Sequence, residues 1–431
     1  MSLKVMPDRT RTSRTKKQSS AFWSVFKLRS GPFYDYNLLA VVIILTCFGL
    51  VMLYSASAYE ATRTFGDDMH YFKRQLLISA FGIFLALVIS KIDYHFILRF
   101  SVMIYGISIV LMAAVRFTPF GVEINGARRW LGYGTWTFQP SEIAKIAVIL
   151  IVVYMIKRLG RDYKSFQGTV LVGALGVVAA GAAYIFTENL STAIIILGIS
   201  IGILFVSHPK TSYFVIGFIV AVAAVAGLLF YIITNIESSE SFRVTRVLTW
   251  IDPEKYSELG GWQVLQGLYA IGSGGIFGKG LGNSTQKLDI IPEAGNDMIF
   301  SIICEELGLF GALLVIILFG YLLYRLVVIA QNAPDKQGAL IATGIFVHIS
   351  LQVVLNICVV LNVIPTTGIT LPFISYGGTS VVFLMIEMGI ALSISAKIHV
   401  NDEKTVIIDA RTRKNITRER RRQERTGSGA I

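Results

Sequence analysis

The feature that most constrains this chain is a series of long apolar runs separated by shorter polar segments. The runs lie near 38–57, 76–93, 97–115, 142–157, 169–186, 190–206, 212–234, 298–328, 338–361 and 377–397. A helix needs about 20 mostly apolar residues to cross the hydrocarbon core of a bilayer. Because 54% of the residues are hydrophobic and only 15% are charged, the runs predict an all-α polytopic membrane protein with ten transmembrane helices.

The distribution of Lys and Arg predicts the orientation, because these residues concentrate in cytoplasmic loops. With a cytoplasmic N-terminus, 27 of the 39 Lys and Arg residues fall on the cytoplasmic side. An even number of spans then places both termini there. We expect basic cytoplasmic tails at 1–36 and 399–431 around a membrane domain at 37–398. The net charge of +12 lies mostly in the tails and short loops, which favours an anionic membrane over nucleic acid as its partner.

The outer side then carries the longest loops, at 116–141 and at 235–297, the second lying between the seventh and eighth spans. Loops of this length are commonly functional. A third outer segment, "LNVIPTTGITLPFISYGGTS" at 361–380, contains two prolines and cannot be a continuous helix. Non-helical backbone at membrane depth must be buried in protein or line a wet cavity. We interpret this segment as a re-entrant loop that closes a site from above, with a plain surface loop as the alternative.

The start of the fourth span carries charged residues. Arg128 and Arg129 lie in the preceding loop, and paired arginines suit a ligand that bears phosphate. Glu142 and Lys145 are spaced i, i+3, so they share a helix face and can pair. One interpretation is a plain ion pair; the other is a functional group, because ionisable side chains inside a span are costly.

The start of the eighth span, "IIPEAGNDMIFSIICEELG" at 290–308, carries three further acids. Asp297 is a natural helix N-cap, and capping alone would explain an acid there. Glu305 follows eight residues later, about 80° around an ideal helix, and is expected to face the same cavity as Asp297. Glu306 is expected to point elsewhere, toward a neighbouring helix.

The large outer loop contains a predicted interfacial helix, "GWQVLQGLYAIGSGG" at 261–275. The overlapping run "GSGGIFGKGLG" resembles a phosphate-binding loop only superficially, because no strand precedes it. We interpret it as a flexible segment whose backbone approaches a ligand closely. The three cysteines and five histidines show no metal-ligand spacing.

These motifs together resemble the SEDS family of bacterial shape, elongation, division and sporulation proteins. The residues that carry the resemblance are "NGARRW" at 125–130, "FQPSEIAK" at 138–145, "AIGSGGIFGKGLG" at 270–282, "PEAGNDMIF" at 292–300, "EELGLFG" at 305–311 and "PTTGITLPFISYGGTS" at 365–380. There are two departures. The chain has "ENLSTA" at 188–193 where many relatives carry "PDLGTA", so no catalytic role is carried over to Asn189. It also has "AGND" where "HTD" is frequent, so any help from that His is absent.

The resemblance implies a peptidoglycan glycosyltransferase that polymerises lipid II at the outer face of the bacterial cytoplasmic membrane, beside a class B penicillin-binding protein. It matches the essential acid of the family to Asp297. The "ENLSTA" form and the basic tails favour the division or sporulation branch over the elongation branch. The division branch implies divisome partners and a position at the septum.

The expected reaction is an inverting glycosyl transfer between lipid II and a lipid-linked glycan. Asp297 is the expected general base, because it lies on the wet side where the acceptor hydroxyl is presented. The leaving undecaprenyl pyrophosphate needs cations, and Glu305 is expected to support the same site. The first expected substrate-binding cations are Arg128, Arg129 and Lys145, and Lys145 is expected to pair with Glu142 in the same site. The second group of candidates is Arg243, Arg246 and Lys279. A divalent cation (Mg or Mn) is left open, since no closed ligand set is readable.

Transport is the main alternative, with the protein acting as a lipid II flippase. The Glu142–Lys145 and Glu305–Glu306 groups would then line a path through the membrane. No inverted repeat, the usual mark of a transporter, is visible in the chain. A passive scaffold for division proteins would explain the tails but not the charged outer face.

Overall fold

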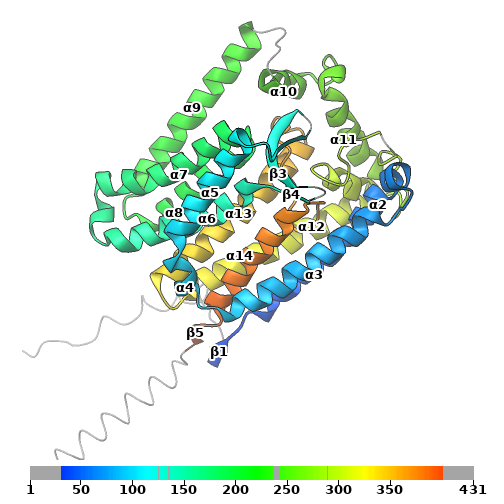
Figure 1. Ribbon diagram of the computed structural model, residues 1–431. Coiled ribbons are helices and arrows are strands. Elements are labelled where there is room, and N and C mark those ends of the chain that lie inside the picture. Colours follow the sequence, from blue (N-terminus) through cyan, green and yellow to red (C-terminus); the bar gives the residue numbers. More distant parts are fainter. Residues whose placement is uncertain (1–30, 125, 134–135, 236–241, 289, 401–431) are drawn as a thin grey trace, which may run out of the picture. The chain divides into compact units, whose positions relative to one another are not determined.

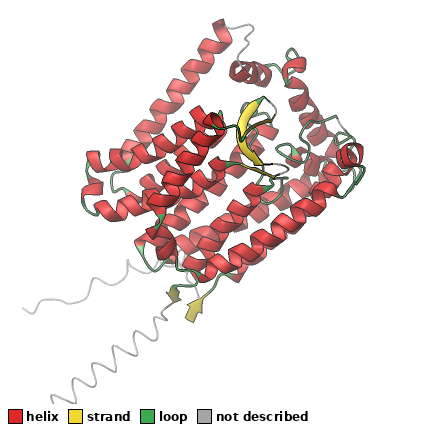
Figure 2. Cartoon of the chain, in the orientation of Figure 1, coloured by secondary structure: helices red, strands yellow, loops and turns green. Residues whose placement is uncertain are grey.

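The computed structural model describes residues 31–124, 126–133, 136–235, 242–288 and 290–400. In this part of the chain helices dominate, with a few short strands (Figures 1 and 2). Nearly all of the predicted tails, 1–30 and 401–431, lies outside the described residues. Their cytoplasmic position therefore stays a prediction.

Each of the ten expected runs lies on helical structure. The helices are α2 (Tyr36–Phe65), α3 (His70–Lys91), α4 and α5 (Tyr94–Arg99 and Ser101–Phe117), α6 (Pro140–Leu159), α7 (Phe166–Thr187), α8 (Leu190–Ser207), α9 (Ser212–Asn235), α12 (Ile299–Asn332), α13 (Lys336–Val360) and α14 (Thr379–Ser395). A short 3-10 helix, η1 (Asp162–Lys164), connects α6 to α7. The third run differs from expectation, because it is divided between α4 and α5 at Phe100.

Six of these helices, in the part of the chain that the structure describes, are long and apolar enough to cross a membrane: α2, α3, α7, α8, α12 and α13. The apolar parts of α5, α9 and α14 are shorter, and α6 carries Glu142, Lys145, Lys157 and Arg158. The prediction of an all-α polytopic membrane protein is thus confirmed in its class. These lengths alone do not establish the predicted number of ten membrane-spanning helices.

The helices pack closely where small residues face a neighbour. A Cβ added at Gly389 of α14 would lie 2.8 Å from the carbonyl oxygen of Ala86 in α3. Similarly, a Cβ at Gly176 of α7 would lie 2.3 Å from Ser200 Oγ in α8. Small residues let helix backbones approach in this way where lipid provides no hydrophobic driving force.

A small antiparallel sheet in the 116–141 loop was not predicted. Its strands are β2 (Gly121–Ile124), β3 (Ala127–Tyr133) and β4 (Trp136–Phe138), in the order β2-β3-β4. Val122 pairs with Trp130 and Leu131 pairs with Phe138, with an irregularity after Val122. Strands this short leave little periodicity to detect.

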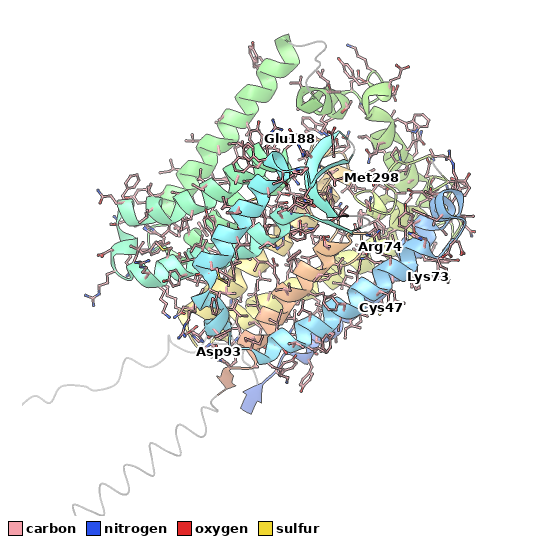
Figure 3. The ribbon with its side chains drawn as sticks, viewed as in Figure 1. Cys47, Lys73, Arg74, Asp93, Glu188 and Met298 are labelled. Atoms are coloured by element: carbon pink, nitrogen blue, oxygen red, sulfur yellow. The ribbon has the colours of Figure 1, made fainter. Side chains whose placement is uncertain are left out.

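The large loop contains α10 (Phe242–Ile251), η2 (Ser257–Leu259) and α11 (Gly261–Gly274), so the interfacial helix expected at 261–275 is confirmed as a helix. Figure 1 shows β3, α10 and α11 toward the same end of the helices. Asp93, before α4, lies toward the other end from Met298 (Figure 3). At the Asp93 end, His95 bonds Asp93 and Asp335 at 2.9 and 2.6 Å, and Lys397 pairs with Asp93.

The helix α12 is discontinuous, because Gly308 has φ 65° and ψ −158° inside it. The glycine-rich loop after α11 fills the break. The backbone N–H groups of Lys279 and Gly280 donate to the carbonyls of Glu305 and Glu306, both at 2.9 Å, and Leu309 N–H donates to Gly275 O at 3.0 Å.

This arrangement gives two glycines of "GSGGIFGKGLG" a contact within the protein, and the approach of the segment to a ligand stays a prediction. A Cβ on Gly274 would lie 1.9 Å from Cys304 O, and a Cβ on Gly278 would lie 2.2 Å from Glu306 O. The glycines are needed because the loop backbone approaches α12 this closely. At these two glycines the loop therefore approaches a protein helix.

A separate small unit joins the two ends of the described chain. Its strands β1 (Gly31–Phe33) and β5 (Ile398–Val400) pair antiparallel, with Gly31 opposite Val400.

Candidate functional site

The candidate site centres on Asp297, which precedes α12. The residue that caps α12 is Met298, and no side chain makes the capping hydrogen bond. The explanation of Asp297 as only a helix cap is therefore wrong. Its Oδ1 is buried and has no hydrogen-bond partner within the described part of the chain. A buried carboxylate oxygen without a partner is costly, which makes Asp297 a functional candidate.

The backbone around Asp297 is held by the 361–378 segment and by α13. Ser375 Oγ donates to Asn296 O at 2.7 Å, and Tyr376 N–H donates to Gly295 O at 2.9 Å. Asn356 Nδ2 from α13 donates to Asp297 O at 2.9 Å and to Ile369 O at 2.7 Å. The main chain at Asp297 is thus fixed from two sides.

The 361–378 segment is not a plain surface loop. Leu371, Phe373, Ile374 and Ser375 are at most 2% exposed. A Cβ added at Gly49 of α2 would lie 2.6 Å from both Ile374 Cα and Phe373 O, so the segment packs directly on that helix. The expectation of non-helical backbone buried in protein is confirmed, while its depth in a bilayer stays a prediction.

Arg246 and Arg129 bring positive charge to Asp297 from distant parts of the sequence. Arg246 lies on α10, and its Nη1 donates to Thr366 O at 3.0 Å. Burial lowers the pKa of Arg246 and the neighbouring charge of Arg129 adds to this, while Asp297 opposes it. These effects place Arg246 in the electrostatic surroundings of Asp297, and Arg129 in those of Arg246. Trp250 on the same helix donates to Asn362 O at 3.0 Å and helps to hold α10 over the segment.

The surroundings give Asp297 the pKa of a general base. The pKa of this carboxyl is raised to about 7, because burial and, to a smaller extent, the nearby Glu293 raise it more than Arg246 lowers it. A base works best when its pKa lies near the working pH. Glu293 was missed in the sequence, although it lies four residues before Asp297, because the two residues lie in a turn segment where no helix or strand period relates them.

Arg128 has structural contacts that its sequence did not indicate. Its Nη2 donates to Thr118 O at 2.7 Å and its Nε to Gly121 O at 3.2 Å, so the guanidinium ties β3 to the chain before β2. Phosphate binding by Arg128 stays a prediction. Arg129, the next residue on β3, is the member of the pair that reaches the surroundings of Arg246.

Glu142 and Lys145 form the ion pair expected from their spacing. The Lys145 Nζ to Glu142 Oε2 distance is 2.9 Å, and the two side chains are only 3% and 8% exposed. Pro140 begins α6. The pair is buried at the N-terminus of α6, and its part in binding substrate stays a prediction.

Glu305 and Glu306 both hold the loop after α11. Glu305 accepts hydrogen bonds from Lys279 Nζ at 2.7 Å, from Thr285 and from Ser284. None of these hydrogen bonds involves Asp297. A cavity shared by Glu305 and Asp297 therefore stays a prediction. Lys279 has Glu305 as its ion-pair partner. Glu306 contacts Ser55 of α2 at 2.7 Å, which confirms that it points to a neighbouring helix.

Two further expectations concern cations. The side chain of Arg243, at the start of α10, lies outside the described residues. Among the residues that were described, no group of three or more His, Cys, Asp or Glu side chains is arranged to hold a metal ion. The charged groups gathered at Asp297 are therefore one base candidate, one further acid and two arginines.

Fold and site together define a class: a polytopic α-helical membrane protein with a buried carboxylate at the mouth of a discontinuous helix. The FtsW/RodA/SpoVE family model, described as cell cycle protein, matches residues 35–399. The chain belongs to this family.

Named relatives agree with this membership. The chain is 36% identical over 362 residues to Stage V sporulation protein E of Bacillus subtilis, covering 84% of this chain and 96% of that protein. It is 34% identical over 363 residues to the probable peptidoglycan glycosyltransferase FtsW of Trichlorobacter lovleyi, covering 84% and 93%.

Solved structures share the fold. A chain from a structure described as "Structural coordination of polymerization and crosslinking by a peptidoglycan synthase complex" has a TM-score of 0.70 at 28% identity, covering 85% of this chain and 99% of that one. The rod shape determining protein RodA of Thermus thermophilus has a TM-score of 0.61 at 26% identity, covering 86% and 98%.

Proposed function

We propose that this protein is a peptidoglycan glycosyltransferase that polymerises lipid II at the outer face of the bacterial cytoplasmic membrane. The observation that carries the proposal is the buried carboxyl of Asp297, whose pKa is about 7, with Arg246 near it and Arg129 near Arg246. The relatives named as peptidoglycan glycosyltransferases support it.

Asp297 acts as the general base in the proposed reaction. It takes the proton from the 4-hydroxyl of the GlcNAc in the acceptor lipid II, and the hydroxyl oxygen attacks C1 of the MurNAc at the end of the growing glycan. The bond from C1 to undecaprenyl pyrophosphate breaks with inversion. Attack and departure on opposite faces require the base and the cations to lie on different sides of the sugar.

Arg129 and Arg246 stabilise the leaving pyrophosphate. Charge develops on its oxygens as the bond to C1 breaks, and fixed cations in a water-poor site stabilise that charge more than water does. The Arg246 guanidinium is held before substrate arrives by Thr366 O, while Arg129 lies on β3. A divalent cation on the pyrophosphate stays open, and no step here depends on it.

The proposed topology has ten spans, both termini in the cytoplasm and the 235–297 loop outside. Contacts between loops support it. Asp93, Asp335 and Lys397, all expected on the cytoplasmic side, are linked to one another through direct pairs or through His95. Arg246, Thr366 and Asp297, all expected outside, also lie together.

The proposed partner is a class B penicillin-binding protein, which would crosslink the glycan. The fold shared with a chain of a peptidoglycan synthase complex supports this pairing. We further propose a role in septal wall synthesis with divisome proteins. The chain is similar to both FtsW and a sporulation protein. A fluorescent fusion of the protein should therefore be imaged in cells, and its signal at the septum compared with its signal at the forming spore.

The test uses purified protein with its penicillin-binding partner and fluorescent lipid II. Wild type is expected to produce glycan polymer, resolved on a gel, and Asp297→Asn is expected to produce none while remaining folded. Asp252→Asn, in the same outer loop, is the matched control and is expected to polymerise normally. Normal polymer from Asp297→Asn would refute the assigned base. Movement of lipid II between leaflets without polymer would instead favour the flippase.

A further inference from the structure

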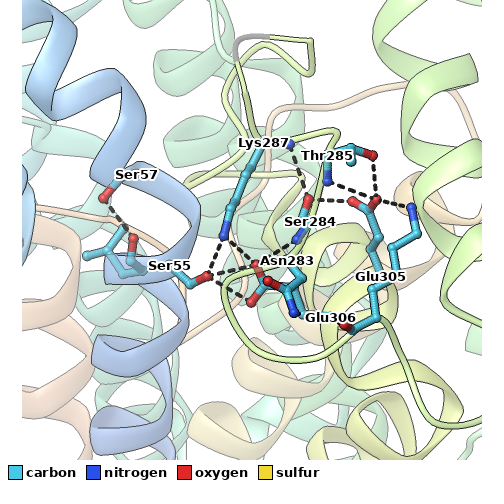
Figure 4. A network of polar contacts seen from close by, with 10 residues as sticks. Ser55, Ser57, Asn283, Ser284, Thr285, Lys287, Glu305 and Glu306 are labelled. Carbon is cyan, nitrogen blue, oxygen red and sulfur yellow. Dashed lines mark hydrogen bonds and ion pairs between the residues drawn. The ribbon is translucent and has the colours of Figure 1, made fainter.

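A buried polar cluster joins α12, the loop after α11 and α2 (Figure 4). Lys287 Nζ contacts Glu306 Oε1 at 2.7 Å and Ser55 Oγ at 2.9 Å. Ser55 in turn donates to Glu306 at 2.7 Å. Glu306 is fully buried, and Ser55 and Lys287 are 8% and 9% exposed. No sequence motif indicates a role for Lys287.

The cluster lies on the short N-terminal half of α12. The break at Gly308 separates residues 299–307 from the rest of the helix, so the usual hydrogen bonds across that point are replaced by bonds to the loop at 275–280. Asp297 lies immediately before this half-helix. The half-helix therefore depends on side contacts for its position.

Those side contacts run to α2, which also touches the chain at Asp297. Ser55 is on α2, and a Cβ added at Gly295 would lie 3.3 Å from Leu53 and 3.8 Å from Ser57 on the same helix. One helix thus supports both the Glu306 end of the half-helix and the segment that carries the base. Catalytic groups need support of this kind, because they must be held to within about 0.5 Å of their working position.

We propose that Ser55, Lys287 and Glu306 form a positioning cluster that holds the half-helix of α12 against α2 and thereby keeps Asp297 buried at its working position. This rests on the proposed function of Asp297 as the base. None of the three residues touches substrate in this role. They act through the helix that Asp297 precedes.

Glu305, the residue before Glu306, binds the same loop that carries Lys287. Glu305 holds Lys279 and Thr285, at 2.7 and 3.1 Å, and Ser284 N–H approaches Glu306 Oε1 at 3.4 Å. The two adjacent acids therefore both bind the 279–287 loop, Glu305 from Lys279 to Thr285 and Glu306 at Ser284 and Lys287. Loosening Lys287 or Ser55 removes the tie to α2 while leaving the Glu305 contacts in place.

The test compares Ser55→Ala and Lys287→Met with wild type in the lipid II polymerisation assay. We expect kcat to fall about 10- to 100-fold with KM within twofold, since misplacement by about 1 Å has effects of this size. We also expect the acidic midpoint of the pH–rate profile to move below that of wild type, because water then reaches Asp297. Loss of structure alone would lower the active fraction without moving this midpoint.

Two matched controls separate positioning from stability. Ser57→Ala is the same substitution on α2; it removes only Oγ, which bonds the carbonyl of Leu53 in its own helix, and keeps the Cβ that lies toward Gly295. Asp35→Asn weakens the other tie between the start of α2 and α12, the buried pair with Arg325 at 2.8 Å. Both controls are expected to keep the wild-type midpoint, and Asp35→Asn to lower the melting temperature.

The outcomes are distinct. Ser55→Ala that keeps both the wild-type kcat and midpoint, like Ser57→Ala, overturns the positioning role even if Lys287→Met fails to fold. Wild type that polymerises in the same experiment leaves the proposed function standing. Wild type that makes no polymer with its partner present overturns the proposed function, and the positioning role with it.

Discussion

Replacing Asp297 with asparagine removes a charge only at pH values where the carboxyl has lost its proton. Because the pKa is about 7 rather than the ordinary 3.8, the folded protein holds this proton more tightly than the unfolded chain. Ionising Asp297 therefore costs folding stability. The cost begins as pH rises above the unfolded pKa, grows up to the folded pKa and is constant above it.

The difference between these pKa values corresponds to about 4 kcal/mol at full ionisation. Between pH 5 and pH 8 the wild type should lose about 3 kcal/mol relative to Asp297→Asn, since ionisation is mostly completed in that interval. The asparagine variant is expected to be inactive and yet to melt at a higher temperature than wild type at pH 8. The gap between the two melting temperatures should narrow as the pH approaches 5.

Activity provides the second measurement. The kcat/KM of wild type should rise with pH through an acidic midpoint near 7, because the base must be ionised in the free enzyme. Melting curves and polymerisation rates at half-unit steps of pH would test both. A midpoint near 4, or melting temperatures that change in parallel for the two proteins, would refute the burial argument for Asp297.

Three other predictions concern the charged neighbours of Asp297, the Glu142–Lys145 pair and the loop that fills the break in α12. Arg246→Gln should move the acidic midpoint upward and Glu293→Gln should move it downward, because these residues lower and raise the pKa of the base; equal shifts in one direction would contradict this. Lys145→Met should destabilise by about 3–5 kcal/mol by leaving buried Glu142 unpaired, and the double variant with Glu142→Gln should recover most of that in melting experiments. Gly274→Ala should reduce folded yield in detergent, because its Cβ would lie 1.9 Å from a carbonyl oxygen of α12; a normal yield would argue against the inserted loop.

The parts of the fold that could be predicted are those with local causes. Apolar runs of sufficient length located the helices, because each helix satisfies its own backbone hydrogen bonds. The pairing of Glu142 with Lys145 followed from i, i+3 spacing within one helix. The direction of Glu306 followed from its angle around α12 relative to Asp297. Each of these depends on residues that are near one another in the chain.

The candidate site was predictable only in part, because its members come from distant segments. Arg129, Arg246 and Asp297 lie on β3, on α10 and before α12, and periodicity carries no information about which loops meet. Arg246 was ranked behind Arg128 in the sequence, whereas the structure places Arg246 at Asp297 and gives the Arg128 guanidinium to backbone carbonyls. The resemblance to a family identified Asp297, but only the structure shows which charged residues surround it.

The acids that begin α12 illustrate how similar side chains take different roles from their surroundings. Glu305 and Glu306 each have a lysine within 2.7 Å, so both are committed to holding the chain together. Arg246 is the nearest cation named for Asp297, yet its Nη1 is directed at Thr366 O, and its attraction only partly offsets burial. A carboxylate with its own close ion pair would lose basicity, since a salt bridge favours the ionised form. Asp297 therefore holds its proton up to about pH 7, because burial outweighs the attraction of Arg246, whose Nη1 is engaged by Thr366 O.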